Sequence, residues 1–292
     1  MLKKLQRYWP VINCVIIILL LLIHFVFREM NHYFSLLFYA FPLPVIICIT
    51  LSFVFTLKGK LKYYNLILTF ILLAIWCNRS LHITVTNSIK ENDTEIVFWN
   101  ATHKREFKHV FDACKSLPDL VVLVEYHAEE IEHIKAKHPS AYFYWHEDSE
   151  IGVFSKAPIS VKEIVISKHN SVIINFTTQR LNCFAVDVNS SLLVSRQEEL
   201  AFVNHTILNK QPSIVLGDFN LPYESIFFNT IKANFNHVLT KKGNGFRETW
   251  FWNIPLLSLD HIWVSKDLNI LNADKMSTWK SDHSMIKTVI QR

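Results

Sequence analysis

The sequence predicts an α/β domain that follows two or three transmembrane helices, and three features of the chain support this prediction. Long apolar runs without charge lie within the first 80 of the 292 residues. Beyond them, short runs rich in β-branched residues alternate with segments of helical periodicity. Strand-like runs are too numerous for an all-helical domain, and the rest of the chain is long enough for one core. We therefore expect a membrane anchor at residues 1–80, a linker at residues 81–94 and one folded domain at residues 95–292.

Two apolar runs are long enough to cross a bilayer. Residues 11–27 and residues 35–57 contain no charged side chain. At a rise of about 1.5 Å per residue, each can cross a hydrocarbon core of about 30 Å. A third run, residues 61–78, has Lys62 at its edge, and we expect it to form a third span. A cleaved signal peptide is disfavoured, because no small-residue cleavage site follows Phe27.

Basic residues flank these runs unevenly. Three precede the first run and three lie between the second and third, whereas the first loop has one, beside a glutamate. The residues before the first run are Lys3, Lys4 and Arg7, and those between the second and third runs are Lys58, Lys60 and Lys62. The first loop has Arg28 beside Glu29. The positive-inside rule then places the N-terminus and the second loop in the cytoplasm. With the third run as a span, we expect the folded domain to be exoplasmic. The domain would be cytoplasmic if the third run did not span the membrane.

The positive net charge of the chain belongs to the anchor. Residues 1–80 contain eight of the 30 basic residues and one of the 25 acidic residues, so the anchor has a net charge of +7 and the remainder −2. A domain that binds duplex nucleic acid usually has a basic face. The division therefore makes the lipid bilayer the expected partner and disfavours nucleic acid without excluding it. No protein partner can be inferred. Cys114 and Cys183 have no CxxC spacing, and we expect free, buried thiols.

Strands and helices alternate along the domain. The runs that predict strands are residues 95–100, 119–125, 151–156, 161–167, 171–178, 181–188, 212–220, 259–265 and 281–292. The segments that predict helices are residues 103–117, 128–138 and 195–208. In the first of these segments, Phe107, Val110, Phe111 and Cys114 recur at the spacing of one helical face.

Polar residues follow the ends of five buried runs. They are Asn100, Glu125, Asp218 with Asn220, Asp260 with His261, and Asp282 with His283. A turn is the ordinary explanation for one such ending, but five endings of this kind indicate a shared cleft at one edge of a sheet. In an extended chain, Asp218 and Asn220 would point to the same side. Carboxylate and amide oxygens suit Mg²⁺ or Mn²⁺, whereas Zn²⁺ sites favour His and Cys.

Five motifs in a fixed order carry a family resemblance. They are FWN, LVVLVE, IVLGDFN, ETWFWNIPLLSLDHIWVS and SDHSM. In this order and with these intervals, the chain resembles the endonuclease/exonuclease/phosphatase superfamily over roughly residues 95–290. The resemblance implies a deoxyribonuclease-like, four-layered α/β/β/α sandwich after the N-terminal transmembrane helices. The Thr249-Trp250 element, together with the apolar runs, is most similar to the bacterial membrane-anchored branch, which implies the inner or plasma membrane of a bacterium.

The resemblance also implies a metal site that holds Mg²⁺ or Mn²⁺. Glu125 matches the acidic metal ligand of the superfamily, and Asn100 matches the amide near the same ion. Asp282 matches a second acidic residue near the metal.

Four further residues match catalytic positions. Asp218 matches the carboxylate that positions or deprotonates the attacking water, and Asn220 matches its amide companion at the phosphate. His283 matches the histidine that contacts the scissile phosphate, and Asp260 matches the carboxylate that orients this histidine. A His–Asp pair of this kind favours the charged imidazole, which suits an anionic phosphate.

One position departs from the pattern. Relatives usually have a His or Tyr near the phosphate where this chain has Asp187, and a carboxylate there repels a phosphate. Arg196 or a second cation could lie against Asp187, or the carboxyl could be protonated or bind metal. The resemblance thus implies a metal-dependent hydrolase of phosphodiesters or phosphomonoesters and does not identify its substrate. The membrane anchor and the slightly acidic domain favour a lipid or nucleotide phosphoester over nucleic acid. The alternative is a degenerate, non-catalytic binding or scaffold domain on the same fold.

Overall fold

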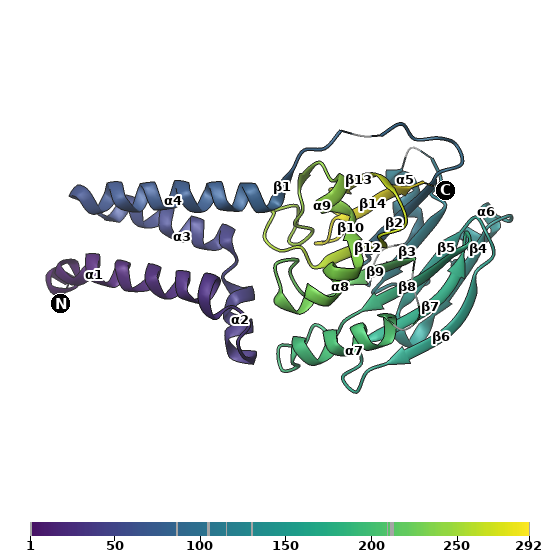
Figure 1. Cartoon of the computed structure of the whole chain (residues 1–292), viewed down its shortest axis with the longest axis horizontal. Helices are drawn as coiled ribbons and strands as arrows, with labels where there is room; N and C mark the ends of the chain where they lie inside the picture. Colours follow the sequence, from purple (N-terminus) through teal and green to yellow (C-terminus); the bar gives the residue numbers. More distant parts are fainter. Residues whose placement is uncertain are drawn as a thin grey trace. The chain divides into compact units, whose positions relative to one another are not determined.

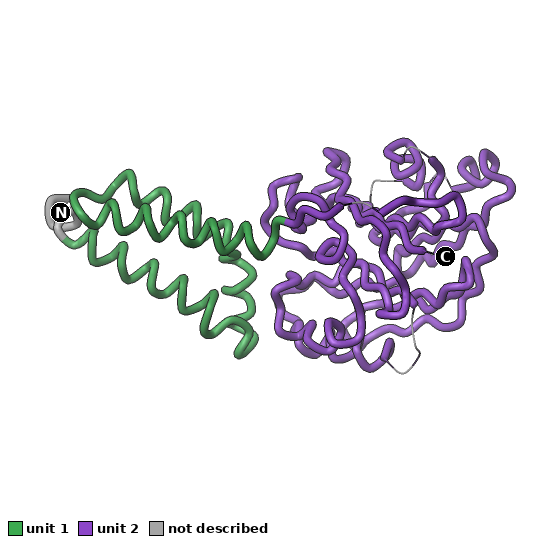
Figure 2. The backbone as a smooth tube through the Cα atoms, turned by 45° about the horizontal axis from the view of Figure 1, so that its top comes forward, with its two compact units in different colours: residues 1–81 green, residues 82–292 purple. Residues whose placement is uncertain are grey.

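The structure is a computed structural model that describes residues 2–85, 87–103, 106–114, 116–129, 131–208, 210 and 213–291, with side chains from Tyr8 onward. The chain divides into two compact units, Met1–Leu81 and His82–Arg292 (Figure 2). We describe each unit by itself.

Unit 1 is helical. Its elements are α1 (Leu2–Leu21), which continues as the π-helical segment η1 (Leu22–Phe27), then α2 (His32–Ala40), α3 (Leu43–Thr56) and α4 (Gly59–Ser80) (Figure 1). Tyr8–Phe27 and Gly59–Ser80 are each long and apolar enough to cross a membrane. The third apolar run, which we expected to form a third span, lies within the second of these helices.

The second apolar run is not one straight helix. We expected residues 35–57 to cross the bilayer as a single span, but α2 and α3 meet at an angle of 61°. Pro42 precedes α3 and a second proline follows at Pro44. Proline has no backbone N–H to donate and disfavours the helical conformation of the residue before it, so the helix breaks at Phe41. The bent pair provides a third crossing only if its two helices count as one broken span.

The helices of unit 1 alternate in direction. The Trp9 Nε1 atom donates to Thr56 Oγ1 at 2.9 Å, which places the beginning of α1 beside the end of α3. The Arg79 guanidinium lies 5.5 Å from the centre of the Phe25 ring, which places the end of α4 beside the end of the first apolar helix. The basic turn between α3 and α4 is therefore at the same end of unit 1 as the N-terminus, as the charge distribution predicts.

Unit 2 contains two six-stranded sheets (Figure 1). The first sheet has the order β13 (Ile270–Met276), β14 (Met285–Ile290), β2 (Thr94–Asn100), β3 (Leu120–Val124), β5 (Ile151–Ser155) and β4 (Tyr142–His146). The second has the order β10 (Phe235–His237), β12 (Asp260–Ser265), β9 (Ile214–Asp218), β8 (Leu181–Asp187), β7 (Val172–Thr178) and β6 (Ser160–Ile166). The pairs β2–β3 and β8–β9 are parallel, and the other neighbours are antiparallel.

The alternation of side chains along the strands produces four layers. In β2, Ile96 and Phe98 point into the core between the sheets, whereas Val97 and Trp99 point outward. The outward faces are covered by α5 (Phe107–Ala113) and α6 (Ile131–Lys137) on the first sheet, and by α7 (Arg196–Leu208) and α8 (Asn229–Asn234) on the second. The α/β/β/α sandwich expected from the resemblance is confirmed. A short helix α9 (Val238–Lys242) and a short strand β11 (Gly245–Phe246) complete the C-terminal half with the 3₁₀ turn η3 (Ile226–Phe228).

Several predicted boundaries are wrong. The first two helices are shorter than expected, and the strand expected to end at Glu125 ends at Val124. The strand expected at residues 212–220 is described from Ser213 and runs over Ile214–Asp218, and Pro212 lies outside the described residues. Strands β4, β10 and β13 were not predicted, because β4 has no clean alternation and the other two are short or interrupted by polar residues. The cysteine prediction agrees with the structure in that Cys114 and Cys183 are free, although only Cys183 is fully buried.

The segment predicted as a linker follows the surface of unit 2. The Thr84 N–H donates to Asn244 Oδ1 at 2.9 Å, and the Asn87 N–H donates to the Leu271 carbonyl at 3.3 Å. These contacts fix part of the segment before β2 begins.

Candidate active site

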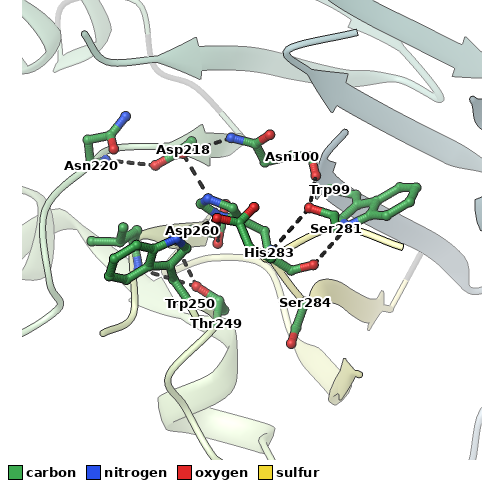
Figure 3. A network of polar contacts seen from close by, with 12 residues as sticks. Trp99, Asn100, Asp218, Asn220, Thr249, Trp250, Asp260, Ser281, His283 and Ser284 are labelled. Atoms are coloured by element: carbon green, nitrogen blue, oxygen red, sulfur yellow. Dashed lines mark hydrogen bonds and ion pairs between the residues drawn. The ribbon is translucent and has the colours of Figure 1, made fainter. Parts of the chain in front are cut away.

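Three buried side chains from both sheets form the centre of the site, and we call them the inner cluster: Asp218, Asp260 and His283. Asp218 ends β9 and Asp260 begins β12, and antiparallel pairing places them opposite each other. His283 lies just before β14 of the other sheet, with Nδ1 at 2.8 Å from Asp260 Oδ2 and 4.0 Å from Asp218 Oδ2 (Figure 3). A histidine is thus held between two carboxylates inside the protein.

Asn100 joins the inner cluster to Glu125. Parallel pairing of β2 and β3 brings the ends of both strands to one edge. There the Asn100 Nδ2 atom donates to Glu125 Oε1 at 3.1 Å and to Asp218 Oδ2 at 3.0 Å. Its Oδ1 atom accepts from the Thr102 N–H at 2.9 Å. Asn100 was expected near the metal as an amide ligand, but here its oxygen is engaged and its nitrogen orients two carboxylates.

The loop before β14 is fixed by hydrogen bonds on both sides. Asp282 Oδ1 accepts from Thr102 Oγ1 at 3.2 Å, and Asp282 Oδ2 accepts from Trp250 Nε1 at 2.9 Å. Ser281 Oγ accepts from the His283 N–H at 3.0 Å and donates to the Asn100 carbonyl at 3.1 Å (Figure 3). The seven residues expected at the site are therefore connected through one set of polar contacts.

Asn220 does not follow the extended geometry that the sequence suggested. The strand ends at Asp218, and Asn220 has a φ of 50° in the left-handed region. The chain turns because Asp218 Oδ1 accepts the Asn220 N–H at 2.8 Å, which closes an Asx turn. The Asn220 Nδ2 atom donates to the Val188 carbonyl at 2.7 Å. The expectation that both side chains point to one side of an extended strand was wrong, and Asp218 has a turn-forming role besides any chemical one.

Asp187 lies beside Asp218. It ends β8, and the parallel register places it opposite Asp218 in β9. Burial raises the pKa of the Asp187 carboxyl well above its usual range, and the charges of Asp218 and Glu125 raise it further. The surroundings of Asp187 therefore favour the neutral form of its carboxyl group more strongly than water does. Arg196 donates to the backbone carbonyls of Asn189 and Ser190 in the loop after β8.

Burial and charge set the protonation states of the inner cluster. Burial raises the pKa of Asp218 to about 7, and the charge of Asp260 acts in the same direction. Burial alone would lower the pKa of His283, but the charge and hydrogen bond of Asp260 outweigh it. Together with the charge of Asp218 they raise the pKa of His283 to about 10. At neutral pH the site thus combines an imidazolium with a carboxyl group that is poised to exchange a proton.

The donor set fits a divalent cation. The candidate ligand atoms of Asp218 and Asp260 lie within 4.8 Å of each other, and Asp260 Oδ1 is buried with no hydrogen-bond partner among the described residues. Glu125 and Asp282 add carboxylates on either side of the turn from Asn100 to Thr102. Oxygen ligands of this kind are those that Mg²⁺ and Mn²⁺ prefer.

The sequence prediction missed three hydroxyl groups that support the site. Thr249 Oγ1 accepts the buried N–H groups of Leu259 and Asp260, both at 3.2 Å. Ser281 Oγ lies 2.6 Å from Thr102 Oγ1. The SDH and Thr-Trp motifs contained two of these residues, but only the spatial pairing of their loops reveals what the hydroxyl groups contact.

Comparisons with known structures agree with this fold. The structure is similar to D. rerio TDP2 carrying 14 humanizing mutations (TM-score 0.51, 17% identity, covering 69% of this chain and 100% of that chain). It is also similar to an endonuclease/exonuclease/phosphatase family protein from Bacteroides thetaiotaomicron (TM-score 0.52, 13% identity, 68% and 97% covered). A mannosyl-6-phosphatase from the same organism gives a TM-score of 0.51 at 13% identity, with 68% and 100% covered. No curated protein sequence matches the chain.

The family is established by the sequence profile of the Endonuclease/Exonuclease/phosphatase family, which matches residues 75–283. This match includes all three residues of the inner cluster as well as Asn100 and Glu125. The chain therefore belongs to the endonuclease/exonuclease/phosphatase family.

Proposed function

We propose that the protein is a membrane-anchored, divalent-metal-dependent phosphoesterase that hydrolyses its substrate with an activated water. The observation that carries this proposal is the continuous path of contacts from Glu125 through Asn100 and Asp218 to His283 and Asp260. The path joins a candidate cation ligand, a candidate base and a buried imidazolium. Phosphoester hydrolysis needs each of them beside the same phosphorus atom.

Each residue has a distinct role in the proposed mechanism. The imidazolium of His283 faces the phosphate and stabilises the charge that develops on its oxygens, and Asp260 keeps the ring oriented and charged. Asp218 orients the attacking water and accepts its proton, which a carboxyl group with a pKa of about 7 can do at neutral pH.

Glu125 and Asp282 would hold Mg²⁺ or Mn²⁺ in this mechanism. When bound, the cation supplies positive charge against the phosphate oxygens. Asn100 keeps Glu125 and Asp218 apart and oriented. Asn220 uses one amide hydrogen on the Val188 carbonyl, and an amide nitrogen carries two, so the second remains for the phosphate.

The substrate is proposed to be a lipid or small phosphoester. The structural neighbours do not decide between substrate classes, since one is a mannosyl-6-phosphatase and another is complexed with a single-strand DNA product. The loop after Trp250 favours lipid: Phe251, Trp252 and Ile254 are 37%, 38% and 54% exposed, and the Trp252 N–H donates to the Asp282 carbonyl at 2.9 Å. Trp279, which is 74% exposed, lies near this loop through the contact of Thr278 with Asn253. An exposed apolar surface of this kind beside an anchored active site suits a bilayer.

The main test is an assay of the full-length protein in detergent against a panel of phosphodiesters and phosphomonoesters, with Mg²⁺, with Mn²⁺ and with a chelator. We expect hydrolysis that the chelator abolishes. Absence of metal-dependent hydrolysis on every substrate would favour the degenerate, non-catalytic alternative. Asp187→His would then be the first substitution to test for restored activity.

The lipid preference has its own test. Trp252→Ala should lower the rate on a long-chain lipid phosphodiester in mixed micelles and leave the rate on a water-soluble analogue nearly unchanged. Ile166→Ala, which truncates an exposed side chain on the distant edge strand β6, serves as the control. Equal losses on both substrates would exclude lipid contact as the role of Trp252.

We propose further that unit 2 is exoplasmic. The basic residues before the first apolar helix and between α3 and α4 support this orientation. A reporter that is active on only one side of the membrane, fused after the last residue, tests it. A cytoplasmic signal would mean that the chain crosses the membrane an even number of times.

A further inference from the structure

A second group of histidine and glutamate side chains lies beside Glu125 and has no part in the proposed hydrolysis. We call it the outer cluster: His103, His127 and Glu150. His103 Nδ1 lies 2.7 Å from Glu150 Oε2, and His127 Nε2 lies 3.4 Å from Glu150 Oε1. The two imidazole rings have centroids 5.2 Å apart. One nitrogen or oxygen atom from each residue lies within 4.8 Å of the others, which is the spacing of ligands around one metal ion.

Three adjacent strands hold the outer cluster in place. His103 follows β2, His127 follows β3, and Glu150 precedes β5, and these strands are neighbours in the first sheet. The His103 N–H donates to the Glu125 carbonyl at 2.7 Å, and the Tyr126 N–H donates to the Glu150 carbonyl at 2.8 Å. The backbone at this edge of the sheet therefore brings the three residues of the outer cluster together, and their proximity does not depend only on how exposed side chains are oriented.

The backbone at the outer cluster is held in an uncommon conformation. His103 and Glu150 have φ values of 57° and 52°, and Glu125 between them has a φ of 48°. Non-glycine residues in this left-handed region carry a conformational cost and persist where the surrounding structure holds them. Two of the three residues of the outer cluster, His103 and Glu150, bear this conformational cost. Glu125, which connects them to the inner cluster, bears it as well.

We propose that the outer cluster binds one transition-metal ion of the Zn²⁺ or Co²⁺ type. Two imidazoles with one carboxylate suit such ions, whereas Mg²⁺ prefers oxygen ligands. The side chains of His103, His127 and Glu150 are 47%, 46% and 31% exposed, so an ion can enter from solvent and keep an open coordination position. The outer cluster is thus chemically distinct from the carboxylate-rich inner cluster.

Glu125 links the two metal sites. Its Oε1 atom accepts from Asn100, and its Oε2 atom lies 3.3 Å from His103 Nε2. When His103 coordinates the ion through Nδ1, its Nε2–H donates to Glu125. A carboxylate that accepts the second N–H of a metal-bound histidine fixes the tautomer and the orientation of the ring. Glu125 is therefore a positioning residue for the outer site.

The test is Co²⁺ binding to the full-length protein in detergent at neutral pH, with excess Mg²⁺ to occupy oxygen sites, followed through the visible absorption of the ion. We expect one tightly bound Co²⁺ per chain, which Zn²⁺ displaces. Loss of an orienting partner alone typically weakens metal affinity 10–100-fold, so His127→Ala and the nearly isosteric Glu150→Gln should each weaken it at least about 100-fold. His133→Ala, which removes an exposed histidine of the neighbouring helix α6, should leave the affinity unchanged.

Two further measurements test metal binding at the outer cluster without relying on hydrolysis or on a variant that could fail to fold. Zn²⁺ should raise the thermal unfolding midpoint of the unsubstituted protein and of Asp218→Asn alike, since the outer cluster needs no catalysis. The proposal is overturned if Co²⁺ binds the unsubstituted protein and a folded Glu150→Gln protein with equal affinity, or if Zn²⁺ gives no shift. The outer cluster would then be a set of histidine–glutamate ion pairs.

Discussion

The inner and outer clusters use similar residues in different surroundings. In the inner cluster, Asp218, Asp260 and His283 are nearly inaccessible to solvent, whereas between about a third and a half of each outer side chain is exposed. Charges interact strongly when water is excluded, because the effective dielectric constant is low. The inner cluster can therefore shift pKa values far enough for acid–base chemistry. At the outer cluster solvent screens the same interactions, and only a bound ion would hold the ligands firmly.

The two clusters also differ in their ratio of carboxylates to imidazoles. The inner cluster and Glu125 provide three carboxylates for one histidine, which suits Mg²⁺ and a phosphate held by an imidazolium. The outer cluster has two histidines for one carboxylate, which suits a transition metal. Two neighbouring sites can thus select different ions.

The largest expected effect comes from removing the charge of Asp218. Asp218→Asn keeps the acceptor oxygen that closes the Asx turn, but it cannot accept a proton from water. Loss of general base catalysis should lower kcat about 10²–10⁴-fold with little change in folding. The measurement is metal-dependent hydrolysis with circular dichroism as the folding check, and Asp267→Asn, an exposed carboxylate after β12, is the matched control. Unchanged turnover in Asp218→Asn would reduce Asp218 to a turn residue.

Asp260→Asn tests how burial and charge compete at His283. In the unsubstituted protein the rate should rise as pH increases through about 7, where Asp218 loses its proton, and fall only near pH 10, where His283 loses its charge. Without the Asp260 charge, the lowering effect of burial prevails and the pKa of His283 falls. The alkaline limb of kcat/KM should move to lower pH, and activity at pH 8 should fall by about 10²-fold. An alkaline limb that does not move would show that another group governs it.

Thr249→Val tests the support of the inner cluster without changing its charges. The substitution keeps the shape of the side chain but leaves the buried N–H groups of Leu259 and Asp260 without their acceptor. A buried donor without a partner costs about 1–3 kcal/mol, which corresponds to a fall of about 2–10 °C in the unfolding midpoint of a domain of this size. Thr230→Val, on the exposed surface of α8, should shift the midpoint by much less. Equal shifts would mean that solvent replaces the lost acceptor.

The inner cluster could be found from the sequence because its residues obey a simple rule. Asp218 ends β9 and Asp260 begins β12, and antiparallel pairing of these strands places the two residues opposite each other. Parallel pairing of β2 with β3 brings Asn100 and the residue after β3, Glu125, to one edge in the same way. Alternating strand and helix patterns predicted an α/β domain, and the family resemblance predicted its four layers. The family motifs then indicated which residue of each loop belongs to the site.

Other features could not be found in this way. The Asx turn at Asn220 depends on a hydrogen bond that competes with the extended chain, and the sequence pattern is compatible with both. The residues of the outer cluster lie at different distances from their strands, and Glu150 precedes its strand. Only the sheet order, in which β5 is the neighbour of β3, brings Glu150 to His103. Sequence spacing does not contain that order.

The smallest expected effect is that of the outer cluster on Mg²⁺-dependent hydrolysis. Among the described residues, the path of contacts from His127 to the inner cluster runs through Glu150, His103 and Glu125, and each of these contacts is partly exposed. Exposed ion pairs contribute about 0.2–1 kcal/mol, so His127→Ala should lower kcat/KM by about 2- to 5-fold when transition metals are chelated and Mg²⁺ is in excess. The measurement is the rate relative to His133→Ala under the same conditions. A loss of 100-fold or more in kcat/KM, comparable to that of Asp218→Asn, would mean that the two clusters form one catalytic site. The inner and outer clusters could then no longer be treated as a buried catalytic centre and a separate, exposed metal site.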